Sequence, residues 1–302
     1  KVVLFFTLPV VVLATVFLIS CDKVSQKMNW IAENHECLIM GDSQVQRINP
    51  KYFKSETFNF GSSGEHYFIT YSKLKRITAI KNCRIKMIVL GVSVHNFAPV
   101  YQRLLDLNYP EGKNSLKRYF YFFSFHEDKA FHFKQMILRK DFIRGLIGSP
   151  DWGGLIESTR KNPEIKDNER ILKMHYTIDA GIDFSKQVTY LEKIIRLCRQ
   201  QKIEILAVST PLHTSYKNQI SDIFYRNFSD IIKTANVPHL NFLNDNIPGE
   251  YMSDGNHLNK EGAVIYSKLI ADKAEKLMTE SPDSDYPDPV PSESLQNDAV
   301  SY

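Results

Sequence analysis

The chain has few cysteines, little net charge and no recognisable nucleotide- or metal-binding motif. Its cysteines form no C-x-x-C pair, so the usual spacing of a structural metal site is missing. It contains neither a P-loop nor an H-E-x-x-H sequence. The formal net charge of +4 over 302 residues is mild and indicates no nucleic-acid partner. We therefore expect no metal and no organic cofactor, while a disulfide stays possible among Cys21, Cys37, Cys83 and Cys198.

The charge is unevenly distributed along the chain. Residues 282–302 hold five acidic residues and no Lys or Arg, so removing their charge from the total of +4 leaves about +9 on the rest. This tail is rich in Pro, Ser and Asp, and we expect it to be disordered. A basic body would suit an anionic glycopolymer or a lipid surface, although solubility is the simpler explanation.

The N-terminus carries the longest apolar run. Val2 to Ser20 contains no charged residue, and nineteen helical residues nearly span the ~30 Å hydrocarbon layer of a membrane. Two interpretations stay open, an uncleaved signal-anchor helix and a lipoprotein signal with Cys21 as the lipidated residue. Either one predicts a membrane anchor or signal over 1–21 and an extracytoplasmic domain over 28–281.

Short apolar runs alternate with segments of helical periodicity. We expect strands at 36–40, 57–60, 84–90, 203–208 and 237–242, with helices at 65–80, 183–201, 216–235 and 260–278. This rhythm predicts an α/β fold, with a five-stranded parallel sheet between helical layers. Ligands in such folds bind beyond the carboxyl ends of the strands.

Residues 100–182 interrupt this rhythm as a long insertion between the third and fourth strands. The segment 119–125 is a cluster of aromatic residues flanked by basic ones. We favour a helical subdomain with a buried aromatic face, and the functional alternative is a lid or a membrane-facing platform over the site.

Three polar motifs follow predicted strands or precede the last helix. Gly41-Asp42-Ser43 would place a serine hydroxyl in a sharp turn at the ligand edge of the sheet. Asp254 and His257 are spaced so that the carboxylate can orient the imidazole and leave its other nitrogen to accept the serine proton. In Asn59-Phe60-Gly61-Ser62-Ser63-Gly64, a glycine N–H can face a developing oxyanion. Each motif alone also fits an ordinary turn or helix cap.

Together, in this order, the motifs resemble the SGNH (GDSL-like) hydrolase superfamily, which has a flavodoxin-like three-layer α/β/α fold. The resemblance covers roughly 36–98 and 203–278. It implies that Ser43 is the nucleophile and also an oxyanion donor through its own N–H. It further implies that Gly64 is a second donor, His257 the general base, Asp254 the residue that orients it, and Asp42 a supporting residue.

The third block departs from the family pattern. The family has G-x-N-D after the third strand, with the Asn as third oxyanion donor, whereas this chain reads Gly91-Val92-Ser93-Val94-His95-Asn96. Asn96, His95 or Ser93 could serve, or the third donor is absent. We take Asn96 as the candidate. Losing one such donor costs about 10²–10³ in rate.

Two further stretches, 209–216 and 257–263, together with the apolar N-terminus, resemble the SGNH branch linked to bacterial envelope polysaccharides. This branch includes relatives of alginate-acetylation and teichoic-acid D-alanylation proteins. The resemblance implies an esterase or O-acetyltransferase acting on an acylated glycopolymer, beside a membrane-bound O-acyltransferase. His213 and Tyr216 would then be substrate-pocket candidates, and a helix-entry loop with a packed Tyr explains them equally well.

Two other functions stay open. One is a non-catalytic envelope protein that uses the SGNH scaffold to bind glycan or a partner, which the altered third block favours. The other is a membrane-associated, lipase-like esterase with an acyl groove lined by Phe120, Phe122 and Phe123.

Overall fold

The computed structural model describes residues 2–106, 109–122, 144–146, 148–161, 168–176 and 184–280, with side chains from Val11 onward except at 102 and 116. Five parallel strands form one sheet in the order β2-β1-β3-β4-β5. Their bounds are β1 Cys37–Met40, β2 Thr57–Asn59, β3 Met87–Gly91, β4 Glu204–Ser209 and β5 His239–Asn241. The prediction of a five-stranded parallel sheet is thus confirmed, although the third strand begins at Met87, three residues later than expected.

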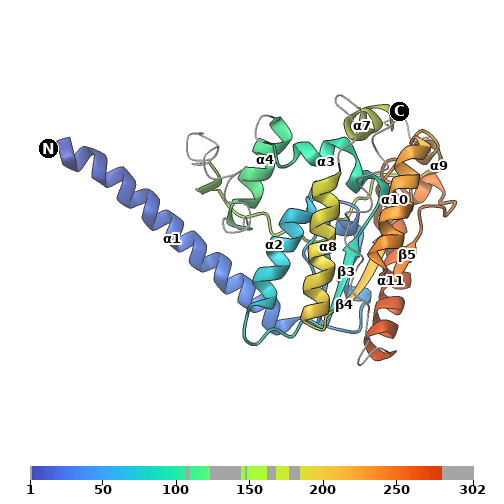
Figure 1. Ribbon diagram of the computed structural model, residues 1–302, viewed down its shortest axis with the longest axis horizontal. Coiled ribbons are helices and arrows are strands. Elements are labelled where there is room, and N and C mark those ends of the chain that lie inside the picture. The colour runs from blue at the N-terminus through green and yellow to red at the C-terminus, as the bar shows by residue number, and fades with distance from the viewer. Residues whose placement is uncertain are drawn as a thin grey trace.

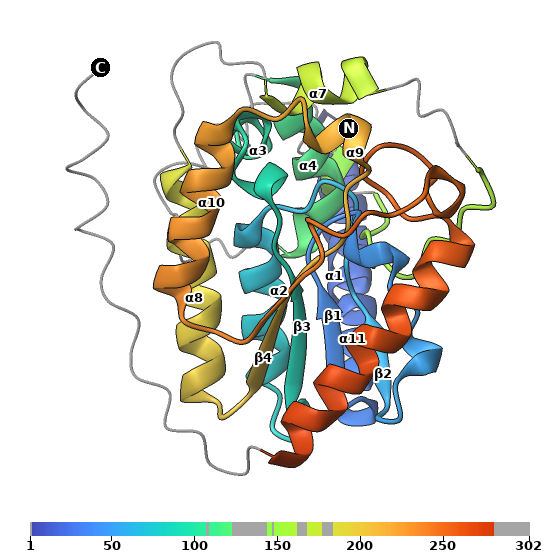
Figure 2. The same ribbon diagram turned by 90° about the vertical axis from the view of Figure 1, so that its right-hand side faces the viewer.

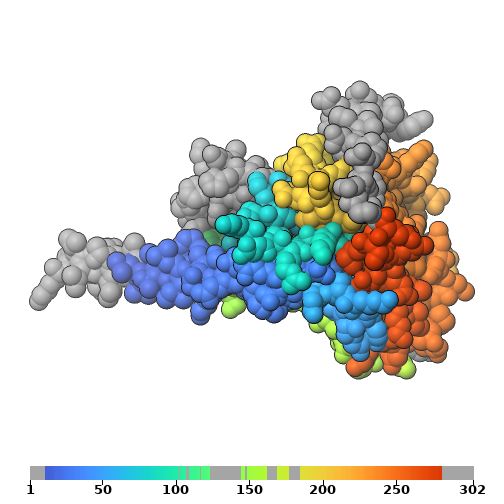
Figure 3. All heavy atoms as spheres, turned by 90° about the horizontal axis from the view of Figure 1, so that it is seen from below, coloured from blue at the N-terminus to red at the C-terminus, as the bar shows by residue number. Residues whose placement is uncertain are grey.

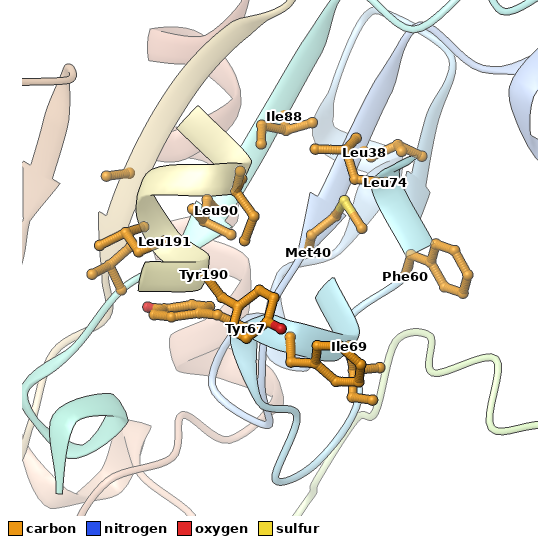
Figure 4. Packing of buried hydrophobic residues seen from close by; sticks show 14 of the residues in the cluster. Leu38, Met40, Phe60, Tyr67, Ile69, Leu74, Ile88, Leu90, Tyr190 and Leu191 are labelled. Atoms are coloured by element: carbon orange, nitrogen blue, oxygen red, sulfur yellow. The ribbon is translucent and has the colours of Figure 1, made fainter. Parts of the chain in front are cut away.

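Helices cover both faces of the sheet, which explains why the central strands are apolar throughout. Alternate residues of β1 point to opposite sides, so Leu38 and Met40 join one core cluster and Cys37 and Ile39 the other. The first cluster is closed by α1 (Val2–Asn34), α2 (Tyr67–Thr78), α8 (Ser185–Gln200) and α10 (Asp222–Ala235). Figure 4 shows this packing between the sheet and α2 and α8. The second cluster is closed mainly by α11 (Lys260–Glu280), which crosses the other face of the sheet (Figure 2).

The helix α1 is 33 residues long and extends well beyond the sheet (Figures 1 and 3). Its C-terminal part belongs to the core, since Val24, Met28 and Ile31 are at most 2% exposed. Within the part of the chain that the structure describes, no helix has the length and apolar character needed to cross a membrane. The expected anchor receives no support from that search, and the side chains of its first ten residues lie outside the described set.

One expected helix is wrong in its extent. In place of one helix over 216–235, the structure has a four-residue helix, α9 (Thr214–Lys217), and then α10, separated by a turn that ends at Ser221 in extended conformation. Apolar spacing continues through this turn because Ile220 and Phe224 both face the core, so periodicity alone hides the break. The other three expected helices form with small shifts at their ends.

The described parts of the insertion include α3 (Pro99–Arg103), α4 (Pro110–Tyr119) and α7 (Asn168–Tyr176), besides the short 3₁₀ turn at Phe120–Phe122. The rings from Tyr119 to Phe122 are 0–7% exposed, as expected for a buried aromatic face. Phe122 packs edge-on against Phe60, and Phe120 packs against Phe17. These enclosed rings form no open acyl groove, while Phe123 and Phe125 lie outside the described residues.

All four cysteines are free, which removes the disulfide alternative. Cys37 and Cys198 are fully buried, and burial raises the pKa of the Cys37 thiol to about 12. Both thiols therefore act as small apolar core residues.

Candidate active site

Three residues from opposite ends of the chain meet at the carboxyl edge of the sheet. Ser43 Oγ lies 2.8 Å from His257 Nε2, and His257 Nδ1 lies 2.9 Å from Asp254 Oδ1. Ser43 follows β1 directly, and the other two lie in the loop that enters α11. The carboxyl ends of parallel strands share one edge, so this loop brings residues 214 positions apart into hydrogen-bonding contact.

Hydrogen bonds within the loop that carries Asp254 and His257 fix its conformation. Asp254 Oδ1 accepts the N–H groups of Asn256 (3.0 Å) and His257 (2.9 Å), and Ser253 N donates to the His257 carbonyl at 2.9 Å. Burial alone would raise the pKa of Asp254, but the hydrogen bond and charge of His257 and these two N–H groups bring it below its usual value. An ionised carboxylate only accepts, so His257 carries its proton on Nδ1 and offers the Nε2 lone pair to the Ser43 hydroxyl.

Asp42 lies beneath the Ser43 turn in a dense network of donors. Its Oδ2 accepts from His95 Nε2, from Asn96 Nδ2 at 2.7 Å and from Tyr101 Oη at 2.6 Å. Its Oδ1 accepts the Gln44 N–H at 3.0 Å. Burial would raise the pKa of Asp42, yet His95 and the other donors hold it well below its usual value. The carboxylate therefore acts as a fixed acceptor that shapes the turn.

This network changes the expectation for the third oxyanion donor. Both ends of the Asn96 amide are engaged, since Nδ2 donates to Asp42 and Oδ1 accepts the Ser93 N–H at 2.7 Å. Asn96 is 1% exposed and supports Asp42 in this arrangement. Among the described residues, the buried Ser93 hydroxyl has no hydrogen-bond partner.

Gln44 is a residue that the sequence reasoning missed. Its side chain joins two loops of the site, because Nε2 donates to the Asn256 carbonyl at 3.2 Å and Oε1 accepts from Thr210 Oγ1 at 3.0 Å. A polar residue in a turn has no periodicity to mark it as buried, yet Gln44 is only 3% exposed. Its position directly after the candidate nucleophile was the available signal.

The loop after β2 packs against the Ser43 turn from the other side. Ser62 N donates to the Gly41 carbonyl at 2.9 Å, and Ser63 Oγ donates to Gln46 Oε1 at 2.6 Å. Gly64 has a positive φ of 64° and faces open space, since a Cβ there would meet no atom within 4 Å. The loop after β2 is thus held against the Ser43 turn, and at Gly64 it adopts a backbone conformation that favours glycine.

The two substrate-pocket candidates differ in their surroundings. Half-exposed His213 caps α9, with Nδ1 accepting the Ser215 N–H at 3.2 Å. Tyr216 is fully buried, and its hydroxyl is hydrogen-bonded to His175 Nδ1 at 2.9 Å. The expectation that Tyr216 lines a substrate pocket is therefore corrected, because its ring lies in the hydrophobic core and its hydroxyl is bonded inside the protein.

His175 gives the protein a pH-dependent stability. Burial, with a further contribution from nearby His95, lowers the pKa of His175 from 6.5 to about 3. Below about pH 6.5 the unfolded chain takes up a proton that the folded chain refuses, so the free energy of unfolding falls by ~1.4 kcal/mol per pH unit. We expect denaturant titrations at about pH 7 and about pH 5 to show this loss, and His175→Gln to make the pH dependence shallower. An unchanged slope in the variant would contradict this assignment.

The returning segment of the insertion, residues 151–158, contacts three of the elements that form the site. Gly154 N donates to the Gly61 carbonyl at 3.1 Å, and Ile156 N donates to the Gln46 carbonyl at 2.9 Å. At the end of the segment, the Ser158 carbonyl oxygen accepts the N–H of Lys260, the first residue of α11, at 2.7 Å. The segment therefore links the Ser43 turn, the loop after β2 and the helix that follows His257.

Gly153 permits this close approach, and alanine there should disturb the site. Its φ is 62°, and a Cβ would lie 2.0 Å from the Gly61 carbonyl oxygen and 2.6 Å from Ser62 Oγ. We expect Gly153→Ala to cost about 1–2 kcal/mol of stability from its left-handed conformation. By displacing the loop, it should also lower any esterase activity about tenfold or more.

Gly154 offers a matched control for this substitution. Its φ of 110° is also unfavourable for alanine, but no atom lies within 4 Å of a Cβ there. Gly154→Ala should lose stability and keep the activity of the folded protein. Equal activities for the two variants, measured with melting temperatures, would contradict a role for the close contact.

The described residues contain no group of three or more His, Cys, Asp or Glu side chains arranged to hold a metal ion.

No protein-family model matches the chain, and no curated protein matches it. A GDSL-like lipase from Bacteroides thetaiotaomicron is similar in structure at 12% identity, covering 85% of this chain and 97% of that chain with a TM-score of 0.41. A protein described as an acylhydrolase from Bacteroides fragilis gives 11% identity, coverages of 85% and 96% and a TM-score of 0.42. A protein described as a platelet activating factor from Streptococcus pneumonia is similar at 12% identity, covering 90% of this chain and 99% of that chain with a TM-score of 0.43. Likenesses at this level identify no family.

Proposed function

We propose that the chain is an SGNH-type serine esterase or O-acyltransferase that forms an acyl-Ser43 intermediate. The observation that carries the proposal is the continuous hydrogen-bonded line from Ser43 Oγ through His257 to the Asp254 carboxylate. A nucleophile, a base and a group that orients the base are the three parts that acyl transfer to a serine needs. The order of the sequence motifs, which resembles the SGNH pattern, supports the same proposal.

The first half of the reaction acylates the serine. Ser43 Oγ attacks the ester carbonyl carbon while its proton passes to His257 Nε2, and the carbonyl oxygen becomes an oxyanion. The N–H groups of Ser43 and Gly64 are the candidate donors to that oxyanion. When the intermediate collapses, the C–O bond to the alcohol breaks and His257 returns the proton to the leaving oxygen.

The second half determines the class of enzyme. Water or a sugar hydroxyl gives its proton to His257 and attacks the acyl carbon, which frees Ser43 and yields an acid or a new ester. We propose an acylated carbohydrate polymer as the substrate, on two grounds. One is the charge of about +9 on the chain outside its acidic tail, and the other is the resemblance of 257–263 to the envelope-polysaccharide branch.

The N-terminal helix motivates a proposal about location. The run Val2–Ser20 has no charge, and Val11, Val12, Leu18 and Ile19 are 51–66% exposed on a helix that extends away from the sheet (Figure 1). We keep membrane attachment through this run or through lipidated Cys21 as part of the proposal, with an extracytoplasmic catalytic domain. A membrane-bound O-acyltransferase would then be a fitting acyl donor. Retention of the chain in washed membranes tests the attachment.

One observation favours a second candidate function. Asn96, the expected third oxyanion donor, is 1% exposed and bonds Asp42 through its amide nitrogen, an arrangement that suits a scaffold that binds glycan without catalysis. The two functions separate in one experiment on the full chain. An enzyme releases acetate from acetylated polysaccharide or transfers acetyl to an added glycan, and its serine reacts with a fluorophosphonate. A scaffold retains the glycan and does none of these.

A further inference from the structure

The peptide between Ser63 and Gly64 is held from outside the predicted active-site motifs. The Ser63 carbonyl oxygen accepts Arg118 Nη1 at 2.7 Å and Tyr119 Oη at 3.1 Å. Both donors come from the end of α4, inside the insertion. Two donors therefore hold this carbonyl, and one of them is a charged guanidinium.

Because the peptide is planar, fixing the direction of the Ser63 carbonyl also fixes the direction of the Gly64 N–H. A trans peptide is planar, and its C=O and N–H point in opposite directions. The Ser63 carbonyl oxygen faces Arg118 and Tyr119, so the Gly64 N–H of the same peptide points away from these two side chains. Within the described residues, that N–H donates to no backbone carbonyl. A charge-assisted bond to the oxygen also polarises the peptide and strengthens its N–H as a donor.

Arg118 is itself fixed by the segment that covers the site. Its Nε donates to Asp151 Oδ2 at 2.9 Å, and Nη2 bonds the same oxygen. The Asp151 N–H returns a bond of 3.0 Å to the Arg118 carbonyl. The other Asp151 oxygen accepts Gly153 N at 2.8 Å, which places the guanidinium and segment 151–158 in one rigid unit.

We infer that Arg118 is a positioning residue that aims and polarises the Gly64 N–H as an oxyanion donor, so that the insertion contributes directly to acyl transfer. The inference rests on the proposed function and extends it to a residue outside the motifs that suggested it. Lysine cannot replace arginine fully here, because an ammonium lacks the planar fork that contacts Ser63 and Asp151 together.

The test compares Arg118→Ala, Arg118→Lys and Tyr119→Phe with wild type, and uses Lys117→Ala as the control. Lys117 is exposed and lies next to Arg118 on α4. We expect Arg118→Ala to lower kcat for an ester substrate roughly tenfold to hundredfold with a smaller change in KM, since the donor is misaimed but present. The kcat of Arg118→Lys should lie between those of Arg118→Ala and wild type. Tyr119→Phe should show a small loss of kcat, and Lys117→Ala should match wild type.

A second measurement separates positioning from a general loss of structure. A thiono ester forms a sulfur anion that accepts hydrogen bonds weakly, so an intact oxyanion site favours the oxygen ester. The preference for the oxygen ester should shrink in Arg118→Ala, and added guanidinium ion should restore part of it. Wild-type kcat and preference in Arg118→Ala would overturn the inference. If Arg118→Ala does not fold and Arg118→Lys does, a wild-type preference for the oxygen ester in Arg118→Lys would also overturn the inference.

The two proposals fail in different ways. If Ser43→Ala keeps the activity, or a fluorophosphonate never labels Ser43 in the wild-type protein, the proposed function is wrong. If Ser43 is labelled and required while the Arg118 variants react at the wild-type rate, only the inference about Arg118 is wrong.

Discussion

Replacing Ser43 by alanine should remove ester hydrolysis, with a loss on the order of 10⁴-fold or more in kcat. The substitution removes the hydroxyl that lies 2.8 Å from His257 Nε2, and with it the covalent step. The residual rate would come from the backbone donors and binding alone. Hydrolysis of p-nitrophenyl acetate by wild type and variant gives the rate, and fluorophosphonate labelling with peptide mapping identifies the serine.

The Ser43 substitution should leave the fold intact. The side chain is only half-buried, and Asp42 and Gln44 continue to hold the turn through their own hydrogen bonds. Ser229→Ala, at an exposed serine on α10, is the matched control and should behave as wild type. If Ser43→Ala hydrolyses the ester at the wild-type rate, the serine nucleophile is disproved and another group must be sought.

The second large effect is expected for Asp254→Asn, with a fall in kcat of about 10³–10⁴-fold. An amide at this position can no longer accept the His257 Nδ1 proton strongly, so the imidazole favours the tautomer with its proton on Nε2. That proton would face Ser43 and prevent the ring from acting as a base. Asn Oδ1 can still accept the N–H groups of Asn256 and His257, which should preserve the loop.

Asp245→Asn provides the matched control for that variant. It makes the same change of carboxylate to amide in the loop after β5, where Asp245 accepts the Tyr266 hydroxyl at 3.0 Å. We expect full activity from this control. Raising the pH should not rescue Asp254→Asn, because the defect is the tautomer of the base and not its protonation. A variant that retains more than about a tenth of the wild-type kcat would argue against an orienting role for Asp254.

The sheet was predictable from sequence because its strands are buried on both faces. Runs such as Cys37–Met40 and Met87–Gly91 are apolar at every position, and glycines mark the turns that end them. Helix ends were less predictable. The break between α9 and α10 depends on Ser221 adopting an extended conformation, which the apolar pattern on either side does not reveal.

The site separates into a part marked by motifs and a part marked by nothing in the sequence. Ser43, Asp254 and His257 lie in short polar stretches beside strands or helix starts, where turn chemistry and spacing make them visible. Gln44, Arg118 and Asp151 are ordinary polar residues whose roles depend on partners that lie 33 to 212 positions away in the chain. No local pattern carries that information.

The sequence by itself determined the α/β class, the five parallel strands and the three residues that can form a nucleophile, a base and an orienting acid. These follow from local physics, namely apolar runs that must be buried and polar groups placed where strands end. Only the tertiary structure decided that Asn96 supports Asp42, that Tyr216 belongs to the core and that the insertion forms hydrogen bonds with the loops around Ser43. Each of these outcomes depends on contacts between residues that are distant in the sequence, and such contacts form only where folding brings those residues together.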